Sequence, residues 1–150
     1  MRHKNLLLSM TLVGLLGTGT VSAEDPAKAG PQRAKAPAGA QVSIVAPADG
    51  ATVGQDFKVE FGAKNISVAP ATNTAPGTGH HHLLIDAAEL PPLDLPIPAD
   101  GTHKHYGKGQ TEDTIHLEPG DHTLQLDFAD ALHMQFDPPI VSKKITIHVK

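Results

Sequence analysis

Histidine is the side chain best able to do chemistry in this sequence, which has ten histidines among 150 residues and no cysteine. Neutral imidazole nitrogen is a good ligand for Cu(II), Zn(II) and Ni(II), and three or four such donors around one point make a metal site. The absence of cysteine excludes a disulfide scaffold, a thiolate zinc site and a thiol nucleophile. Six histidines fall in three separate segments: residues 80–82, His103 with His105, and His133.

The spacing within the first two segments suits a shared metal ion. On an extended strand, residues two positions apart point to the same face and lie about 6 to 7 Å apart. His80 and His82 can therefore reach one ion, whereas His81 points to the other face. His103 and His105 repeat this arrangement. The candidate metal ligands are His80, His82, His103, His105 and His133.

His81 has a different expected environment from its two neighbours. If Leu83 and Ile85 form the inward pair of their strand, His81 shares their face and is buried. A buried imidazole in that position is expected to be hydrogen-bonded rather than bound to metal.

Three further histidines have plainer roles. His116 and His148 each alternate with apolar neighbours, so both are expected on solvent-facing sides of strands. His122 follows a Pro-Gly-Asp turn and is expected to form hydrogen bonds at the surface. None of the three is predicted as a ligand.

An enzymatic function has little support in the sequence. A metal hydrolase needs an open coordination position beside a general base, and Asp86 and Glu112 are the acids available for that role. Neither lies in a recognisable motif, and residues 107–109 are too short a glycine segment to cradle a phosphate. We therefore expect no catalysis and assign no catalytic residue.

A folded domain must position these histidines, and the alternation of apolar and polar residues from residue 41 onward predicts an all-β domain. Short alternating runs are separated by Gly, Pro, Asn and Asp, and no apolar stripe keeps a helical spacing. Phe57, Val59 and Phe61, for example, predict the buried face of one strand. The pattern predicts an immunoglobulin- or fibronectin-like antiparallel β-sandwich of about seven strands, formed by residues 41–150. The expected strands are residues 42–46, 57–63, 80–86, 102–106, 113–118, 122–128 and 140–149.

Two connections within this domain have their own signals. Residues 113–128 predict a hairpin that turns at residues 118–121, where Glu-Pro-Gly-Asp separates two alternating runs. Residues 90–98 contain four prolines and are expected to be extended and outside a sheet interior.

The direction of successive strands predicts that the histidine segments meet. If the strands alternate in direction, the start of the third strand, the turn after the fourth and the loop before the last lie at one pole of the domain. Those places hold residues 80–82, His105 and His133. For His105 the argument depends on the short strand at residues 102–106.

The N-terminal 23 residues read as a secretory signal peptide. Arg2 and Lys4 are basic, residues 6–16 are apolar but too short for a stable membrane span, and residues 21–23 are small enough for cleavage before Glu24. We therefore expect an exported protein in a bacterial periplasm, not embedded in the membrane after cleavage.

Residues 24–40 contain mainly Ala, Pro, Gly and charged residues and are expected to form a disordered tether. Loss of Arg2 and Lys4 with the signal lowers the basic residues from 12 to 10 against 16 acidic ones, which moves the net charge from −4 to −6. Because the lysines are also scattered, we expect no nucleic-acid partner.

Five ordered sequence blocks distinguish this domain: GHHHLLID at 79–86, PIP at 96–98, HYGKGQTE at 105–112, LEPGDHTL at 117–124 and DPP at 137–139. In these blocks the domain resembles a family of small secreted bacterial proteins known as a domain of unknown function. The run at residues 42–53 is also similar to the first strand and turn of many bacterial immunoglobulin-like modules. The resemblance implies export and an immunoglobulin-like sandwich, and it implies no activity.

These observations predict an exported, non-enzymatic β-sandwich that binds copper or zinc through a histidine cluster at one pole. Met134, next to His133, offers a thioether that would favour Cu(I). The alternative is an envelope interaction or structural module without metal, in which residues 90–98 and the tether present the domain to a periplasmic protein partner.

Two quantitative expectations follow from a shared site. At least three of the candidate imidazoles should place ring nitrogens within about 5 Å of a common point. Metal affinity should fall steeply between about pH 7 and pH 5, because imidazoles with an ordinary pKa near 6.5 must lose a proton to bind.

Overall fold

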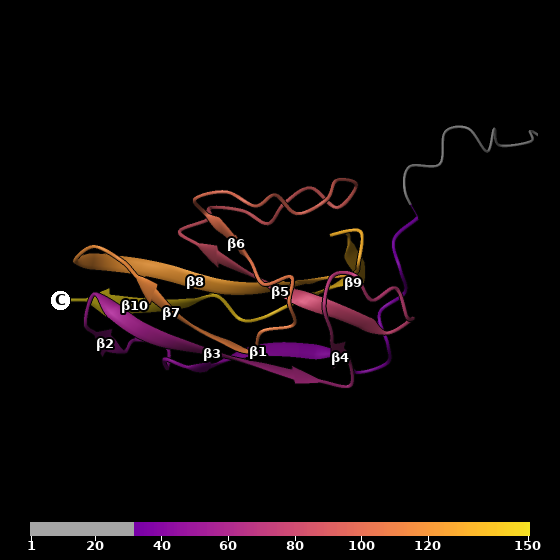
Figure 1. Ribbon diagram of the computed structural model, residues 1–150. Helices are drawn as coiled ribbons and strands as arrows, with labels where there is room; N and C mark the ends of the chain where they lie inside the picture. Colours follow the sequence, from indigo (N-terminus) through magenta and orange to yellow (C-terminus); the bar gives the residue numbers. More distant parts are fainter. Residues whose placement is uncertain (1–31) are drawn as a thin grey trace, which may run out of the picture.

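The computed structural model describes residues 32–150, which form an all-β sandwich of two packed sheets (Figure 1). The smaller sheet has the order β1-β3-β7, and the larger has the order β2-β10-β8-β5-β4, with β6 added to β5 and β9 added to β8. The predicted fold class is confirmed. The strands are β1 (Gln41–Ala46), β2 (Thr52–Val53), β3 (Asp56–Lys64), β4 (Ser67–Val68), β5 (Thr78–Ile85), β6 (His103–His105), β7 (Glu112–His116), β8 (Gly120–Ala129), β9 (Gln135–Val141) and β10 (Ile145–Val149).

The core lies between the two sheets and is built from alternating positions. In β3, Val59 and Phe61 are buried as predicted, and they belong to the same cluster as Leu126 and Phe128 of β8 and Ile147 of β10. Because side chains of a strand alternate between faces, one face of each sheet supplies the core. The longest register within the larger sheet is that of the antiparallel pair β5–β8, which includes residues 80–82.

The prediction that residues 113–128 form a hairpin is wrong. β7 pairs with β3 in the smaller sheet, whereas β8 pairs with β5 and β10 in the larger one, so residues 117–119 cross from one sheet to the other. Ile115 and Leu124 are both buried because they face the same core from opposite sheets. Alternation identifies inward positions, but it does not distinguish a hairpin from an arch between sheets.

The predicted last strand is divided in two. Residues 142–144 interrupt it, and Ser142 forms two hydrogen bonds with Leu126: the Leu126 amide donates to Ser142 Oγ at 2.8 Å, and the Ser142 amide donates to the Leu126 carbonyl at 2.9 Å. The short strand expected at residues 102–106 is present as β6.

The predicted signal peptide, residues 1–23, and most of the predicted tether lie outside the described residues. The described part of the tether is attached to the domain, which corrects the expectation for this stretch. The Ala36 amide donates to the Asp137 carbonyl at 2.9 Å, and the Asp137 amide donates to the Ala34 carbonyl at 2.8 Å. Backbone pairing with the edge of β9 needs no large side chain, which explains why the composition of residues 24–40 did not reveal it.

The segment that joins β5 to β6 lies on the outer side of the larger sheet (Figure 1). It includes the four-proline run, of which Pro91 and Ile97 are buried, and it leads into β6, which pairs with β5 within the sheet. The Ile97 amide donates to the carbonyl of His133 at 2.8 Å, which ties this run to the turn between β8 and β9. β5 is therefore buried on both of its faces.

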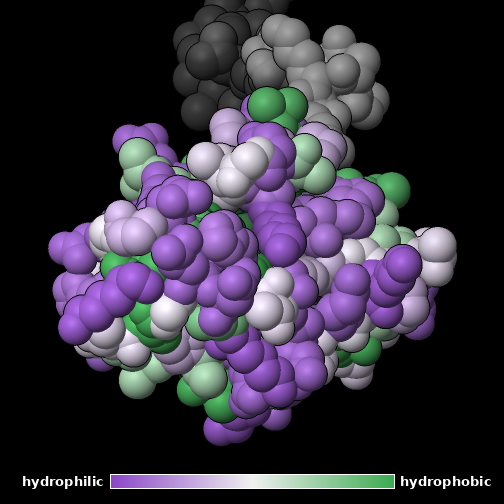
Figure 2. Space-filling model, turned by 60° about the vertical axis from the view of Figure 1, so that its left-hand side comes forward, coloured by the Kyte–Doolittle hydropathy of each residue, from purple (hydrophilic) through white to green (hydrophobic). Residues whose placement is uncertain are grey.

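The surface seen in Figure 2 is mainly hydrophilic, with hydrophobic residues in scattered patches. Among residues 32–150, no helix has the length and hydropathy needed to cross a membrane.

Candidate metal centre

β5 carries three consecutive histidines that are all fully buried, but on different faces. His81 points into the sandwich, where its ring centroid is 5.2 Å from that of Phe61 and 5.0 Å from that of Phe128. His80 and His82 therefore point to the outer face. The burial of His81 agrees with prediction, but its expected hydrogen bond is missing, because neither of its ring nitrogens has a partner among the described residues.

Four imidazoles converge on the outer face of β5. One ring nitrogen from each of His80, His82, His105 and His133 lies within 4.8 Å of the others. Nε2 of His82 is 3.2 Å from Nε2 of His80, and Nε2 of His133 is 3.2 Å from Nε2 of His105. Neighbouring nitrogens around a tetrahedral zinc ion with bonds near 2.0 Å are about 3.3 Å apart. These four residues, called the histidine cluster below, thus have the spacing of a four-ligand metal site.

Three parts of the fold supply the cluster. β5 supplies His80 and His82, and β6 supplies His105, which lies directly opposite His82 in the antiparallel pair. The turn between β8 and β9 supplies His133. Four of the five predicted ligands therefore come together, although His80 and His133 are far apart in the sequence.

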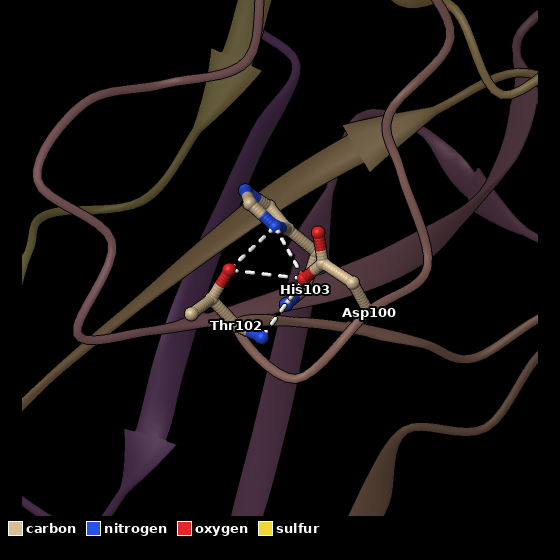
Figure 3. Close-up of polar contacts among 3 residues, drawn as sticks. All are labelled: Asp100, Thr102 and His103. Atoms are coloured by element: carbon tan, nitrogen blue, oxygen red, sulfur yellow. Dashed lines mark hydrogen bonds and ion pairs between the residues drawn. The ribbon is translucent and has the colours of Figure 1, made fainter.

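His103, the fifth predicted ligand, is not part of this group. It lies opposite Leu84, two positions before His105 in β6. Its Nδ1 is 2.9 Å from Oδ1 of Asp100 and 2.8 Å from Oγ1 of Thr102 (Figure 3). The i, i+2 spacing did place His103 and His105 on one face, but the loop before β6 engages the His103 ring.

A glycine makes room for the His105 ring. A Cβ atom at Gly107 would lie 2.3 Å from Cε1 and 2.5 Å from Nε2 of His105, far closer than atoms can approach. Any larger residue at position 107 must displace the imidazole nitrogen that points into the cluster.

His133 is held by a tight turn with an unusual backbone conformation. Its φ is 63°, in the left-handed region that residues other than glycine adopt uncommonly. Oδ1 of Asp130 accepts hydrogen bonds from the amides of Leu132 at 2.8 Å and Met134 at 3.0 Å. Together with the hydrogen bond from Ile97, these contacts compensate the backbone strain and fix the position of the ring.

The environment favours the neutral form of three rings of the cluster. Burial, with further contributions from neighbouring imidazoles, lowers the pKa of His80 to about 4 and that of His82 to about 2. Burial also lowers the pKa of His105, and the nearby His133 adds to this effect. At neutral pH these three rings are uncharged, which is the state that a transition metal requires.

One acidic residue on the same side of the sheet was missed by the sequence analysis. Asp127 of β8 lies directly opposite His82 in the β5–β8 pair and is fully buried. Neither of its carboxylate oxygens has a hydrogen-bond partner within residues 32–150. Burial raises its pKa to about 7, against opposing effects of the Phe128 amide and Arg33. Only the long-range register of β5 with β8 reveals this placement, and the sequence carries no signal for it.

The three remaining histidines of the described chain lie outside the cluster, and each is bonded to an acid. The Nδ1 to carboxylate-oxygen distances are 2.9 Å for His116 and Asp56, 2.7 Å for His122 and Asp86, and 2.6 Å for His148 and Asp121.

Comparison with known proteins gives a family but no function. The model of a family described as "Domain of unknown function (DUF4399)" matches residues 59–150. This stretch runs from within β3 to the C-terminus and contains the whole histidine cluster together with Asp127. No curated protein and no solved structure matches the chain.

Proposed function

Since the chain belongs to the DUF4399 family, which is defined by a domain of unknown function, we propose a function from its site alone: the protein binds a transition-metal ion, copper or zinc, through the histidine cluster. The observation that supports this proposal is the convergence of four ring nitrogens within 4.8 Å. Without an ion, each of the two pairs at 3.2 Å can form one N–H···N hydrogen bond between neutral imidazoles. Pairwise hydrogen bonds do not require both pairs to meet around one point, whereas a shared ion does.

The protein acts as a binding module rather than an enzyme. Structural and storage sites fill a tetrahedral ion with four protein ligands, whereas catalytic zinc sites keep one position open for water or substrate. Four imidazoles provide a complete tetrahedral set. The signal-like N-terminus further supports a periplasmic protein that handles its metal outside the cytoplasm.

The decisive experiment is the metal content of the protein purified without a histidine tag, followed by titration of the metal-free protein with Cu(II) and Zn(II). We expect one equivalent of metal and a dissociation constant below micromolar. Chelation should then lower the melting temperature, because an ion that binds only the folded state stabilises it by RT ln(1 + [L]/Kd), about 2.7 kcal/mol at 100 times Kd.

A second candidate is an envelope interaction module without metal. It is supported by exposed leucines beside the cluster: Leu93 and Leu95 in the proline-rich run are 42% and 54% exposed, and Leu132 in the His133 turn is 70% exposed. The same experiment separates the two functions. If no metal co-purifies, none binds below micromolar and chelation leaves the melting temperature unchanged, the interaction module replaces the metal site.

A further inference from the structure

Unpaired polar atoms gather on the outer face of the larger sheet, next to the histidine cluster. Within the described chain, the buried side-chain nitrogen and oxygen atoms without a partner include Nδ1 of His80 and His82, both carboxylate oxygens of Asp127 and Oε1 of Gln135. Buried polar groups are nearly always hydrogen-bonded, and an unpaired buried carboxylate is among the most costly exceptions. The set contains two nitrogens that can donate and three oxygens that can accept.

The strand register brings these atoms to neighbouring positions. His82 of β5 lies opposite Asp127 of β8, and His80 lies opposite Ala129, which in turn lies opposite Gln135 of β9. Residues directly opposite in an antiparallel pair share a face and have Cβ atoms about 4.5 to 5.5 Å apart. The Asp127 carboxylate therefore belongs to the immediate surroundings of the His82 ring.

The Phe128 amide and the Arg33 guanidinium both act on this carboxylate and lower its pKa. Neither of them forms a hydrogen bond with it. The Arg33 guanidinium, however, donates to the backbone carbonyls of Gln135, at 3.1 Å, and of Phe136. Asp127 is thus a fully buried acid without a hydrogen-bond partner among the described residues, and it lies opposite His82, whose Nδ1 is also unpaired.

Metal binding would explain why a buried carboxylate lies beside unpaired imidazole nitrogens. An imidazole that binds an ion through Nε2 carries its proton on Nδ1, and that N–H group almost always donates to a carboxylate, a carbonyl or a water. Four neutral imidazoles do nothing to balance the charge of the ion they hold. A nearby buried carboxylate stabilises a doubly charged ion more than a singly charged one, because the Coulomb energy scales with the charge of the ion.

We infer that Asp127 is the outer-sphere carboxylate of the histidine cluster, which orients His82 by accepting its Nδ1–H, directly or through a water, and makes the site selective for divalent ions over Cu(I). This inference rests on the proposed metal-binding function and specifies the class of ion. It assigns Asp127 a positioning role and no contact with the metal.

The test compares Asp127→Asn with the wild type in titrations with Zn(II) and Cu(I). Asparagine has the same shape and retains one acceptor oxygen, but it lacks the charge. We expect the Zn(II) affinity to fall about 10- to 100-fold, as for other outer-sphere partners of metal-bound histidine, and the Cu(I) affinity to fall by much less. Asp121→Asn is the matched control, because Asp121 also contacts a histidine, His148, but lies outside the cluster; it should change neither affinity.

The outcomes are distinct. An unchanged Zn(II) affinity in Asp127→Asn, or equal losses for both ions, overturns the inference and leaves the metal site intact. Failure of the wild type to bind either ion overturns the proposed function and the inference with it. A measurement on the wild type alone covers the case in which the variant does not fold: the Zn(II)-loaded protein should show a slowly exchanging, strongly downfield His82 Nδ1–H resonance by NMR. Its absence counts against the role of Asp127.

Discussion

The histidines near the two ends of β8 are in opposite chemical environments. Near its C-terminal end, the imidazoles of the histidine cluster, of which His80 and His82 are buried, face one another and have no acid within hydrogen-bond distance among the described residues. Near its N-terminal end, His122 and its neighbours His116 and His148 are each bonded through Nδ1 to an aspartate.

Among the described residues, ring nitrogens of several histidines converge only at the first of these two ends, and the two groups of histidines also differ in protonation. Burial and neighbouring imidazoles lower the pKa of His80 and His82, whereas hydrogen bonds to Asp86 and Asp56 raise the pKa of His122 and His116. The first situation favours a neutral ligand, and the second favours a cation. The environment of an imidazole, and not its presence, therefore marks a candidate site in a histidine-rich chain.

The largest expected effect comes from removing a ligand. His82→Ala and His105→Ala should each lower the affinity for Cu(II) and Zn(II) at least about 10-fold, because only three of the four imidazole ligands then remain. His116→Ala and His148→Ala should leave it within experimental error in calorimetric titrations. Similar losses in all four variants would indicate nonspecific binding by a histidine-rich surface and would remove the distinction between the two ends.

Much of this distinction was predictable from the sequence. Alternation with apolar neighbours separated His116 and His148 from the candidate ligands, and spacing on a strand paired His80 with His82. The alternating direction of the strands predicted that His105 and His133 lie at the same pole as His80 and His82. For His105 this prediction required the short strand that is present as β6. These inferences needed only local periodicity and the order of the strands.

The parts that were missed depend on contacts that local patterns do not encode. His103 shares a face with His105, but its ring is engaged by Asp100 and Thr102 of the preceding loop. Asp127 became visible only through the pairing of β8 with β5, and the false hairpin at residues 113–128 came from the same lack of pairing information. The alternation of apolar and polar residues predicts the sheet face on which a side chain lies, whereas the register between paired strands determines which residues it contacts.

The next effect tests how closely the fold holds one ligand. Gly107→Ala places a methyl group where the His105 ring now lies, so the ring must rotate or β6 must shift. We expect a several-fold loss of metal affinity, smaller than that of His105→Ala, with a metal-free melting temperature that changes little because position 107 is in a loop. Gly101→Ala is the control, since a Cβ there meets no atom within 4 Å. Unchanged affinity in Gly107→Ala would show that the position of His105 does not matter for binding.

The pH dependence of binding should be weaker than the sequence alone predicts. Four imidazoles with an ordinary pKa of 6.5 would lose about 100-fold in affinity between pH 7 and pH 6, because each binds a competing proton. His80 and His82, with pKa values of about 4 and 2, take up almost no proton in that range. We therefore expect a loss of at most about 10-fold, measured by competition titration at both pH values. A 100-fold loss would show that the cluster is as open to protonation as the exposed histidines.

The smallest effect on metal binding, and the sharpest test of the two environments, uses His81→Leu and His122→Leu. His81 is buried against Phe61 and Phe128, on the core face of β5, and burial lowers its pKa to about 4. Neither variant removes a ligand, so both should bind metal like the wild type. Their effects on stability, however, should have opposite signs at acid pH.

The signs follow from proton binding in the folded and unfolded states. As the pH falls below 6.5, the unfolded chain protonates residue 81 and the folded chain does not, so His81 lowers the free energy of unfolding, by about 2 kcal/mol at pH 5. His81→Leu should remove that loss of stability and also eliminate two buried nitrogens that have no hydrogen-bond partner.

The pKa of His122 is raised by Asp86, so its stabilising contribution is fully present below pH 6.5 and disappears as the pH rises through the raised value. In urea unfolding of the metal-free proteins at pH 5, His81→Leu should therefore be more stable than the wild type and His122→Leu less stable. Shifts of the same sign in both variants would mean that burial and acid pairing do not act on these histidines in opposite directions.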